Sequence, residues 1–156
     1  MAIEVERKFI VPLLPDGIDV HPHAPLQQCY LAIAADGGEV RIRRRNDACM
    51  LTVKQGRGLA RREEEVAITT EIFDSLWSAT EGRRIEKVRH FIPAGDLMIE
   101  LDRYTGMLSG LHVAEIEFHS EESAKAWTPP HWFGPEVTEN LAYKNQQLAL
   151  HGWPAS

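Results

Sequence analysis

The stretch Ile3-Glu4-Val5-Glu6-Arg7-Lys8-Phe9-Ile10-Val11 alternates charged and apolar side chains. Successive side chains of a β-strand point to opposite faces, so Glu4, Glu6 and Lys8 share one face and apolar residues take the other. Two carboxylates beside an ammonium group can hold a divalent cation together with an anion bound to it. Charged alternation is also typical of any half-solvated strand, and this stretch alone does not separate the two interpretations.

The alternation returns in later stretches of the chain, and there most charges are sorted by sign. Acidic residues stand two positions from acidic residues, and basic residues two positions from basic residues. A solvated face has no reason to sort its charges, since like neighbours on a sheet repel. The sorting therefore predicts one kind of subsite for cations and another for anions. The acidic members are Glu63, Glu65, Glu100, Asp102, Glu115 and Glu117, and the basic members are Arg41, Arg43, Lys54, Lys87 and Arg89.

Glu4-Val5-Glu6-Arg7-Lys8 matches the ExExK signature of the CYTH superfamily, the triphosphate tunnel metalloenzymes. A short charged pattern is a modest signal alone, because such patterns also arise by chance. Here the resemblance runs from residue 3 to about residue 150, and further motifs follow in the order of that family. They are Val40-Arg41-Ile42-Arg43, Leu51-Thr52-Val53-Lys54, Glu81-Gly82-Arg83-Arg84-Ile85-Glu86-Lys87-Val88-Arg89, Glu115-Ile116-Glu117-Phe118 and Tyr143-Lys144-Asn145. The chain most resembles the short bacterial members that hydrolyse inorganic tripolyphosphate.

The resemblance implies an α+β fold in a single domain over residues 1–156. Its main element is a closed eight-stranded antiparallel β-barrel, a tunnel with a charged lumen and about three flanking helices. It implies a metal ligand set of Glu4, Glu6, Glu115 and Glu117 and phosphate contacts from Lys8, Arg41, Arg43, Lys54, Lys87 and Arg89. Glu4, Glu6 and Lys8 are the expected catalytic residues. Hard oxygen ligands favour Mg²⁺ or Mn²⁺ over softer metals.

Several candidate site residues keep two interpretations. Glu63, Glu65, Glu100 and Asp102 either bind metal or orient a basic side chain through a salt bridge. Tyr30 either contacts the substrate or fills space inside the barrel. Lys144 either touches phosphate at a tunnel mouth or is a solvated residue of the last helix.

The net charge expected in the lumen bears on whether the substrate can bind without metal. Eight acidic and six basic residues give −2 if every group is ionised. A net negative site does not attract a polyanion, whereas two divalent cations would bring the sum to +2. We therefore expect metal to be required for substrate binding as well as for chemistry.

Composition excludes several classes of protein. The 156-residue chain has a net charge of −6, which argues against binding to a nucleic-acid backbone. No apolar run approaches the roughly 20 residues of a membrane helix. The chain is strand-like from its start, which predicts no signal peptide, and Cys29 and Cys49 have no metal or redox spacing. We expect a cytoplasmic protein.

The pattern outside the charged strands is coarser. Four prolines predict a loop over residues 12–25, followed by a strand over residues 26–33. Thr70 is the expected N-cap of one helix, a second helix is expected over residues 121–127, and Thr138 is the expected cap of a last helix that continues to residue 150.

Charges that face inward leave apolar strand faces outside. We expect some of that surface, around Val5, Ile42 or Ile116, to stay bare. Because monomers seldom expose large apolar patches, this predicts a homodimer.

Three functions fit the pattern. The favoured one is metal-dependent hydrolysis of inorganic tripolyphosphate, a small-molecule substrate, to pyrophosphate and phosphate. The second is that of a class IV adenylate cyclase or a thiamine or nucleoside triphosphatase, although no base-stacking element accompanies the phosphate motifs. The third is a non-catalytic polyphosphate or nucleotide sensor, which would not need so many carboxylates. The phosphate loop G-x-x-x-x-G-K-[ST] is absent from the sequence.

Overall fold

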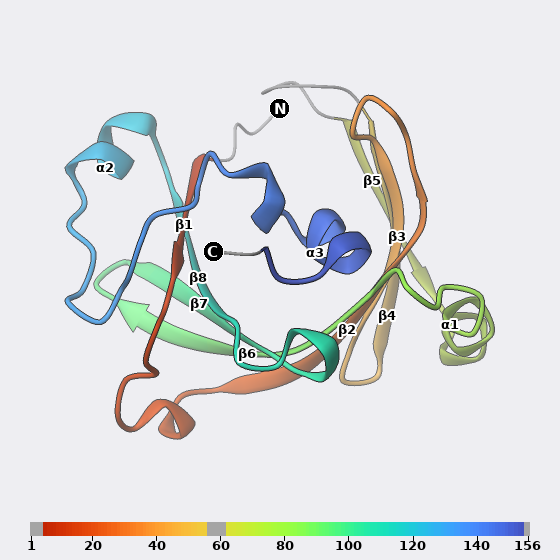
Figure 1. Ribbon diagram of the computed structural model, residues 1–156, viewed down its shortest axis with the longest axis horizontal. Coiled ribbons are helices and arrows are strands. Elements are labelled where there is room, and N and C mark those ends of the chain that lie inside the picture. The colour runs from red at the N-terminus through yellow and green to blue at the C-terminus, as the bar shows by residue number, and fades with distance from the viewer. Residues whose placement is uncertain (1–4, 56–61, 155–156) are drawn as a thin grey trace.

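The computed structural model describes residues 5–55 and 62–154, and one antiparallel sheet forms most of that part (Figure 1). Its eight strands pair in the order β1-β8-β7-β6-β2-β3-β4-β5. This confirms the predicted eight-stranded antiparallel sheet. The strands are β1 (Val5–Ile10), β2 (His23–Ile33), β3 (Glu39–Arg45), β4 (Ala48–Gln55), β5 (Arg62–Ile68), β6 (Arg84–Ala94), β7 (Leu97–Tyr104) and β8 (His112–Phe118).

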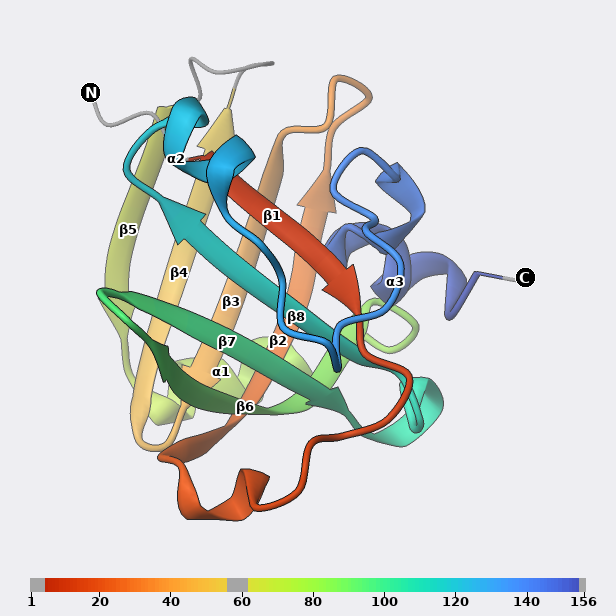
Figure 2. The same ribbon diagram turned by 90° about the vertical axis from the view of Figure 1, so that its left-hand side faces the viewer.

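The sheet curls into two walls that face each other across a lumen. Figure 2 shows β1, β8 and β7 crossing in front of β3, β4 and β5, and Figure 1 shows the two walls joined through β6 and β2. Strands β1 and β5 are the edges of the sheet, and no ladder joins them within the described residues. The predicted hydrogen-bonded closure of the barrel therefore stays a prediction.

Three α-helices accompany the sheet in the described residues, which is the predicted number, but only two of them flank it as predicted. Helix α1 (Thr70–Trp77) and helix α2 (Glu121–Ala126) lie outside the walls, whereas α3 (Asn145–His151) lies between them (Figure 1). Leu148 of α3 is buried against Tyr30 and Ile85, so an apolar cluster holds this helix inside the curl. Short 3₁₀ turns complete the described elements: η1 (Ile18–Val20), η2 (Gly106–Leu108) and η3 (Leu141–Tyr143).

Two predicted helix caps were wrong. Thr69, one residue before the predicted cap, accepts a hydrogen bond from the backbone N–H of Ile72 at 3.1 Å, and Thr70 is already helical. Thr138 caps no helix, because the last helix begins only at Asn145. The Thr138 hydroxyl instead accepts a hydrogen bond from the backbone N–H of Lys8 at 3.0 Å, which ties this segment to β1.

The predicted loop over residues 12–25 ends earlier, because β2 begins at His23 and includes Pro25. Pro25 pairs with Val88 of β6, but the pairing of β2 with β3 begins only at Leu26. A proline is tolerated at this point because the strand has a neighbour on one side only.

The outer faces of the sheet are covered more fully than the sequence predicted. Ile42 has 0% and Ile116 1% of its surface exposed, so the prediction that they stay bare was wrong. Phe73 of α1 packs in the cluster of Ile42, and Trp127 packs against the cluster of Ile116. The argument for a homodimer from bare strand surface therefore no longer holds for these two residues, and the homodimer stays a prediction. Within the described residues, no helix has the length and apolar character needed to span a membrane.

Candidate active site

The pairing register brings acidic side chains together on the inner face of one wall. Directly paired residues of an antiparallel sheet share a face. Glu6 of β1 stands opposite Glu117 of β8, and Glu115 stands between Lys8 of β1 and Glu100 of β7. The Lys8 ammonium lies 3.3 Å from the Glu115 carboxylate. Glu4 lies outside the described residues.

The opposite wall carries basic side chains on its inner face. Arg41 and Arg43 of β3 stand opposite Thr52 and Met50 of β4, and Lys54 of β4 stands opposite Glu63 of β5. Glu65 follows on the same face of β5, opposite Thr52. Burial, together with repulsion from Arg41 and Arg89, lowers the pKa of Arg43. These basic side chains could bind an anion, and Glu63 and Glu65 lie beside them.

A cavity of about 290 Å³ lies between the walls, and every described residue that lines it is polar or charged. It brings together all six predicted phosphate-binding residues and five of the predicted metal ligands. Glu65, Asp102, Tyr30 and Lys144 are not among the described residues that line it. The lining residues are Glu6, Lys8, Gln28, Arg41, Arg43, Lys54, Glu63, Lys87, Arg89, Glu100, Glu115, Glu117 and Asn145.

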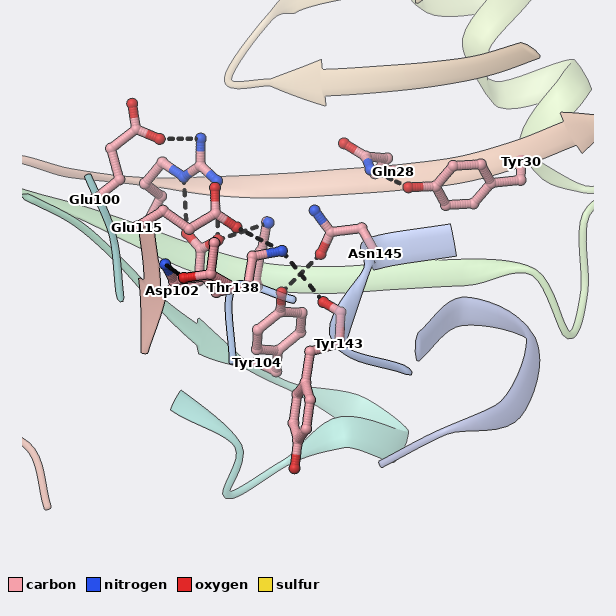
Figure 3. Close-up of polar contacts among 12 residues, drawn as sticks. Gln28, Tyr30, Glu100, Asp102, Tyr104, Glu115, Thr138, Tyr143 and Asn145 are labelled. Carbon is pink, nitrogen blue, oxygen red and sulfur yellow. Dashed lines mark hydrogen bonds and ion pairs between the residues drawn. The ribbon is translucent and has the colours of Figure 1, made fainter. Parts of the chain in front are cut away.

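Asp102 is fully buried and forms an ion cluster with Lys87 and Arg89, which both line the cavity (Figure 3). Its carboxylate accepts hydrogen bonds from Lys87 Nζ at 2.7 Å and from Arg89 Nε and Nη2 at 2.7 and 2.9 Å. Burial alone would raise the pKa of Asp102, but the charges of Lys87 and Arg89 outweigh it and lower the pKa to about 2. Burial lowers the pKa of Lys87. Both oxygens of Asp102 are thus engaged by basic groups.

The carboxylates of β1, β7 and β8 also border a second cavity of about 260 Å³ at one mouth of the lumen, together with Asp96 and His119. Although part of Glu6 is exposed, burial raises its pKa to about 7, assisted by repulsion from Glu115 and Glu117 and opposed by Lys8. In residues 5–55 and 62–154, no three His, Cys, Asp or Glu side chains converge closely enough to hold a metal ion. Carboxylate oxygens are nevertheless the hard, anionic donors that a divalent cation prefers, so these residues could hold one.

Tyr30 and Gln28 sit side by side at the α3 end of the lumen. Gln28 Nε2 donates a hydrogen bond of 2.6 Å to the Tyr30 hydroxyl, and Tyr30 is buried in the cluster that carries α3 (Figure 3). Gln28 reaches the cavity and Tyr30 does not. The two-residue period of a strand places Gln28 and Tyr30 on one face, but it does not indicate which of them reaches the lumen.

Two further polar residues near the lumen, Glu39 and Asn145, were not among the site residues predicted from the sequence. Glu39 is 8% exposed and accepts a hydrogen bond from Gln146 of α3 at 3.3 Å, and the Glu39 carboxylate lies 3.8 Å from Arg41. Asn145 lines the cavity, whereas the neighbouring Lys144 was the predicted contact. The motif Tyr143-Lys144-Asn145 was the available signal, but only the position of α3 shows which residue faces inward.

The chain matches the CYTH domain family over residues 2–145. It belongs to that family. This CYTH domain is 48% identical over 149 residues to the inorganic triphosphatase of Nitrosomonas europaea, covering 94% of this chain and 97% of the relative. It is 34% identical over 151 residues to the inorganic triphosphatase of Acetivibrio thermocellus, covering 95% and 94%.

A solved structure agrees with these matches. The crystal structure of the inorganic triphosphatase NE1496 superposes on this CYTH domain with a TM-score of 0.79 and 44% identity, covering 96% of each chain. The resemblance drawn from the ExExK stretch and the later motifs is confirmed.

Proposed function

We propose that the protein hydrolyses inorganic tripolyphosphate to pyrophosphate and phosphate inside the lumen, with Mg²⁺ or Mn²⁺ as cofactor. One observation carries this proposal: six basic residues and five carboxylates share a single polar cavity of about 290 Å³. Relatives of 48% and 34% identity that are named inorganic triphosphatases support it.

The basic side chains bind the substrate. Arg41, Arg43 and Arg89 hold phosphate oxygens in bidentate fashion, and Lys8, Lys54 and Lys87 supply point charges. The lining has no apolar or aromatic side chain among the described residues, so nothing there would seat an adenine or thiazole ring. This favours an inorganic chain of phosphates over the substrates of adenylate cyclases and of thiamine or nucleoside triphosphatases.

Glu4, Glu6, Glu115 and Glu117 are the proposed metal ligands, and Glu63, Glu65 and Glu100 are further candidates. The raised pKa of Glu6 supports a cation here, since a cation would relieve the repulsion among these carboxylates. A bound divalent cation supplies charge neutralisation on the phosphates and acidifies a bound water. A lumen of many carboxylates also argues against a non-catalytic sensor.

The reaction needs no protein nucleophile, because phosphoryl transfer depends on positioning and charge stabilisation. Water forms a bond to the terminal phosphorus as the bond from phosphorus to the bridging oxygen breaks, and pyrophosphate leaves with the electron pair. We propose that Lys8, close to Glu115, stabilises the negative charge of the transferring group. The proton of the attacking water goes to solvent or to the departing pyrophosphate.

For Asp102 we favour the salt-bridge interpretation. Its oxygens accept three hydrogen bonds from Lys87 and Arg89, and its side chain is 0% exposed. A carboxylate engaged in this way positions two phosphate-binding groups and has no oxygen directed at a metal in the lumen. Closure of the barrel between β1 and β5 remains a prediction from the resemblance, and a cytoplasmic location and a homodimer remain predictions from the sequence.

A substrate panel tests the proposal. Tripolyphosphate, ATP, thiamine triphosphate and pyrophosphate are each incubated with Mg²⁺ or Mn²⁺, and both phosphate and cyclic AMP are measured. We expect fast phosphate release from tripolyphosphate, slow release from the two organic triphosphates and no cyclic AMP. Cyclic AMP from ATP would identify a cyclase, and tight binding without turnover of any compound would identify a sensor.

A further inference from the structure

The start of α3 and the residues just before it are fixed to the acidic wall of the lumen. Lys8 Nζ of β1 donates a hydrogen bond of 3.3 Å to the carbonyl oxygen of Tyr143. The Tyr104 hydroxyl of β7 donates a hydrogen bond of 2.7 Å to Oδ1 of Asn145. Figure 3 shows Tyr104, Tyr143 and Asn145 meeting at this point. The start of α3 is therefore held in place by the same strands that carry the acidic residues.

The hydrogen bond from Tyr104 fixes the orientation of the Asn145 amide. Burial raises the pKa of Tyr104 well above its ordinary value, so the hydroxyl stays protonated and remains a donor. With Oδ1 occupied by that donor, the NH₂ group of Asn145 is the end of the amide left for another partner. Among the described residues, Nδ2 of Asn145 donates no hydrogen bond, although the side chain lines the polar cavity.

An amide N–H at this position can donate a directional hydrogen bond without adding charge, which the lysine side chains of the cavity do not provide. Lys8 and Lys87 line the same cavity and attract anions without directional preference. An amide donor adds direction without adding charge, and its donor capacity does not change with pH. A phosphate oxygen is the acceptor that this cavity is suited to receive.

We propose that Asn145 is a substrate-binding residue whose Nδ2 donates a hydrogen bond to a phosphate oxygen of the polyphosphate at the α3 end of the lumen. Tyr104 is then a positioning residue that presents the amide in the required orientation. The inference rests on the proposed function for the identity of the ligand. It extends the binding set from the sheet to α3.

A structural role for Asn145 is the competing explanation, and two substitutions separate the roles. Asn145→Asp keeps an oxygen that accepts the Tyr104 hydrogen bond, but it removes the N–H donor and adds a negative charge. Asn145→Ala removes both functions of the amide. If Asn145 only anchors α3, the Ala variant should be the less stable one, and the Asp variant should weaken binding only through its added charge, an effect that high salt screens. If Asn145 binds phosphate, the Asp variant should bind the polyphosphate more weakly than the Ala variant does, and high salt should not restore its affinity to that of the wild type.

The experiment measures kcat and KM for tripolyphosphate with Mg²⁺, and calorimetric binding of its non-hydrolysable imido analogue with Mg²⁺. Loss of one hydrogen bond to a charged oxygen should raise KM and Kd about 10- to 100-fold in Asn145→Ala, with a larger rise in Asn145→Asp. Gln147→Ala, on the same helix and outside the described cavity lining, is the matched control and should leave both constants unchanged. Tyr104→Phe should give a smaller rise than Asn145→Ala.

The outcomes distinguish the inference from the proposed function. Wild-type Kd in Asn145→Asp would overturn the role of Asn145, even if Asn145→Ala unfolded. Wild-type protein that binds the analogue but does not hydrolyse tripolyphosphate would overturn the proposed reaction alone, provided that Asn145→Asp weakens binding. Failure of the wild type to bind the analogue would overturn both.

Discussion

Asp102 and Glu6 are carboxylates on the inner face of the same sheet, yet their surroundings shift their pKa values in opposite directions. The pKa of Asp102 falls to about 2, because Lys87 and Arg89 outweigh the effect of burial. The pKa of Glu6 rises to about 7, because burial acts together with repulsion from Glu115. The Asp102 carboxylate is neutralised by two basic side chains of the protein, whereas Glu6 lies among other carboxylates with Lys8 as the opposing charge. A cation is therefore expected at Glu6 and not at Asp102.

Removal of Asp102 should have the largest effect on the fold. Asp102→Ala leaves Lys87 and Arg89 without their shared partner in a site where Lys87 is 3% exposed. Breaking a buried ion pair from one side costs about 3–5 kcal/mol, and we expect that loss in the free energy of unfolding from urea titration. The control Glu64→Gln, at an exposed pair with Arg62, should cost less than about 1 kcal/mol. Equal losses in the two variants would contradict the comparison.

Neutralising one of the proposed metal ligands should affect activity and spare the fold. Glu117→Gln removes a proposed metal ligand opposite Glu6. We expect phosphate release from tripolyphosphate to fall about 100-fold, since a metal contributes several kcal/mol of charge stabilisation. The free energy of unfolding without metal should stay within about 0.5 kcal/mol of the wild type. A destabilisation as large as that of Asp102→Ala would contradict this expectation.

Lys8 is a basic residue within the acidic wall, and its ammonium group lies close to the Glu115 carboxylate. If it contacts the transferring phosphate, Lys8→Ala should lower kcat by about 10- to 100-fold and also raise KM. Arg41→Ala, on the opposite wall, should act mainly on KM. Full recovery of the Lys8→Ala rate in excess Mg²⁺ would instead make Lys8 a counter-ion that keeps Glu6 and Glu115 ready for metal.

The smallest expected effect is on pH dependence. With its pKa near 7, Glu6 must lose a proton to bind metal, so Mg²⁺ affinity at pH 6 should be about tenfold below its value at pH 8. Glu6→Gln should flatten this dependence in calorimetric titrations. Because the folded pKa is raised, the stability contribution of Glu6 in metal-free protein is full below its ordinary value of 4.5 and is lost as pH rises through about 7.

Asp102 should show the opposite sign in acid unfolding. Its folded pKa lies below the ordinary value of 3.8, so its contribution to stability is full above that pH and is lost as pH falls through about 2. Thermal melting of the wild type and Asp102→Asn between pH 2 and pH 5 measures this difference. Curves that stay parallel over that range would contradict the low pKa.

The sequence was sufficient to predict which faces of the strands carry the charges. A period of two assigns Glu6, Arg41 and Lys87 to the charged faces of their strands without knowledge of any neighbour, and the resemblance implies that these faces are the inner ones. It does not assign partners, because the register between strands distant in the sequence comes from pairing over the whole sheet. The contrast between Asp102 and Glu6 depends on that register, and the sequence left both as candidate metal ligands.

Residues outside the strands were harder to predict for a related reason. Thr69 and Thr70 are equivalent caps on local chemistry, and only the backbone distinguishes them. Asn145 reaches the lumen because α3 packs inside the curl through Leu148, a contact without a local signature. The cover over Ile42 and Ile116 likewise comes from segments remote in the chain.

The pairing of β1 with β8 also determines when the lumen can form during synthesis. Val5 pairs with Phe118, Phe9 bridges to Glu136, and α3 enters the curl only with the last part of the chain. Contacts of such sequence separation make folding slow, on a scale of about milliseconds to seconds. Strand β1 must therefore wait, without its partner, until β8 has been synthesised. A nascent chain stalled before β8 would carry most of the phosphate-binding residues and would still lack the wall that makes them a site.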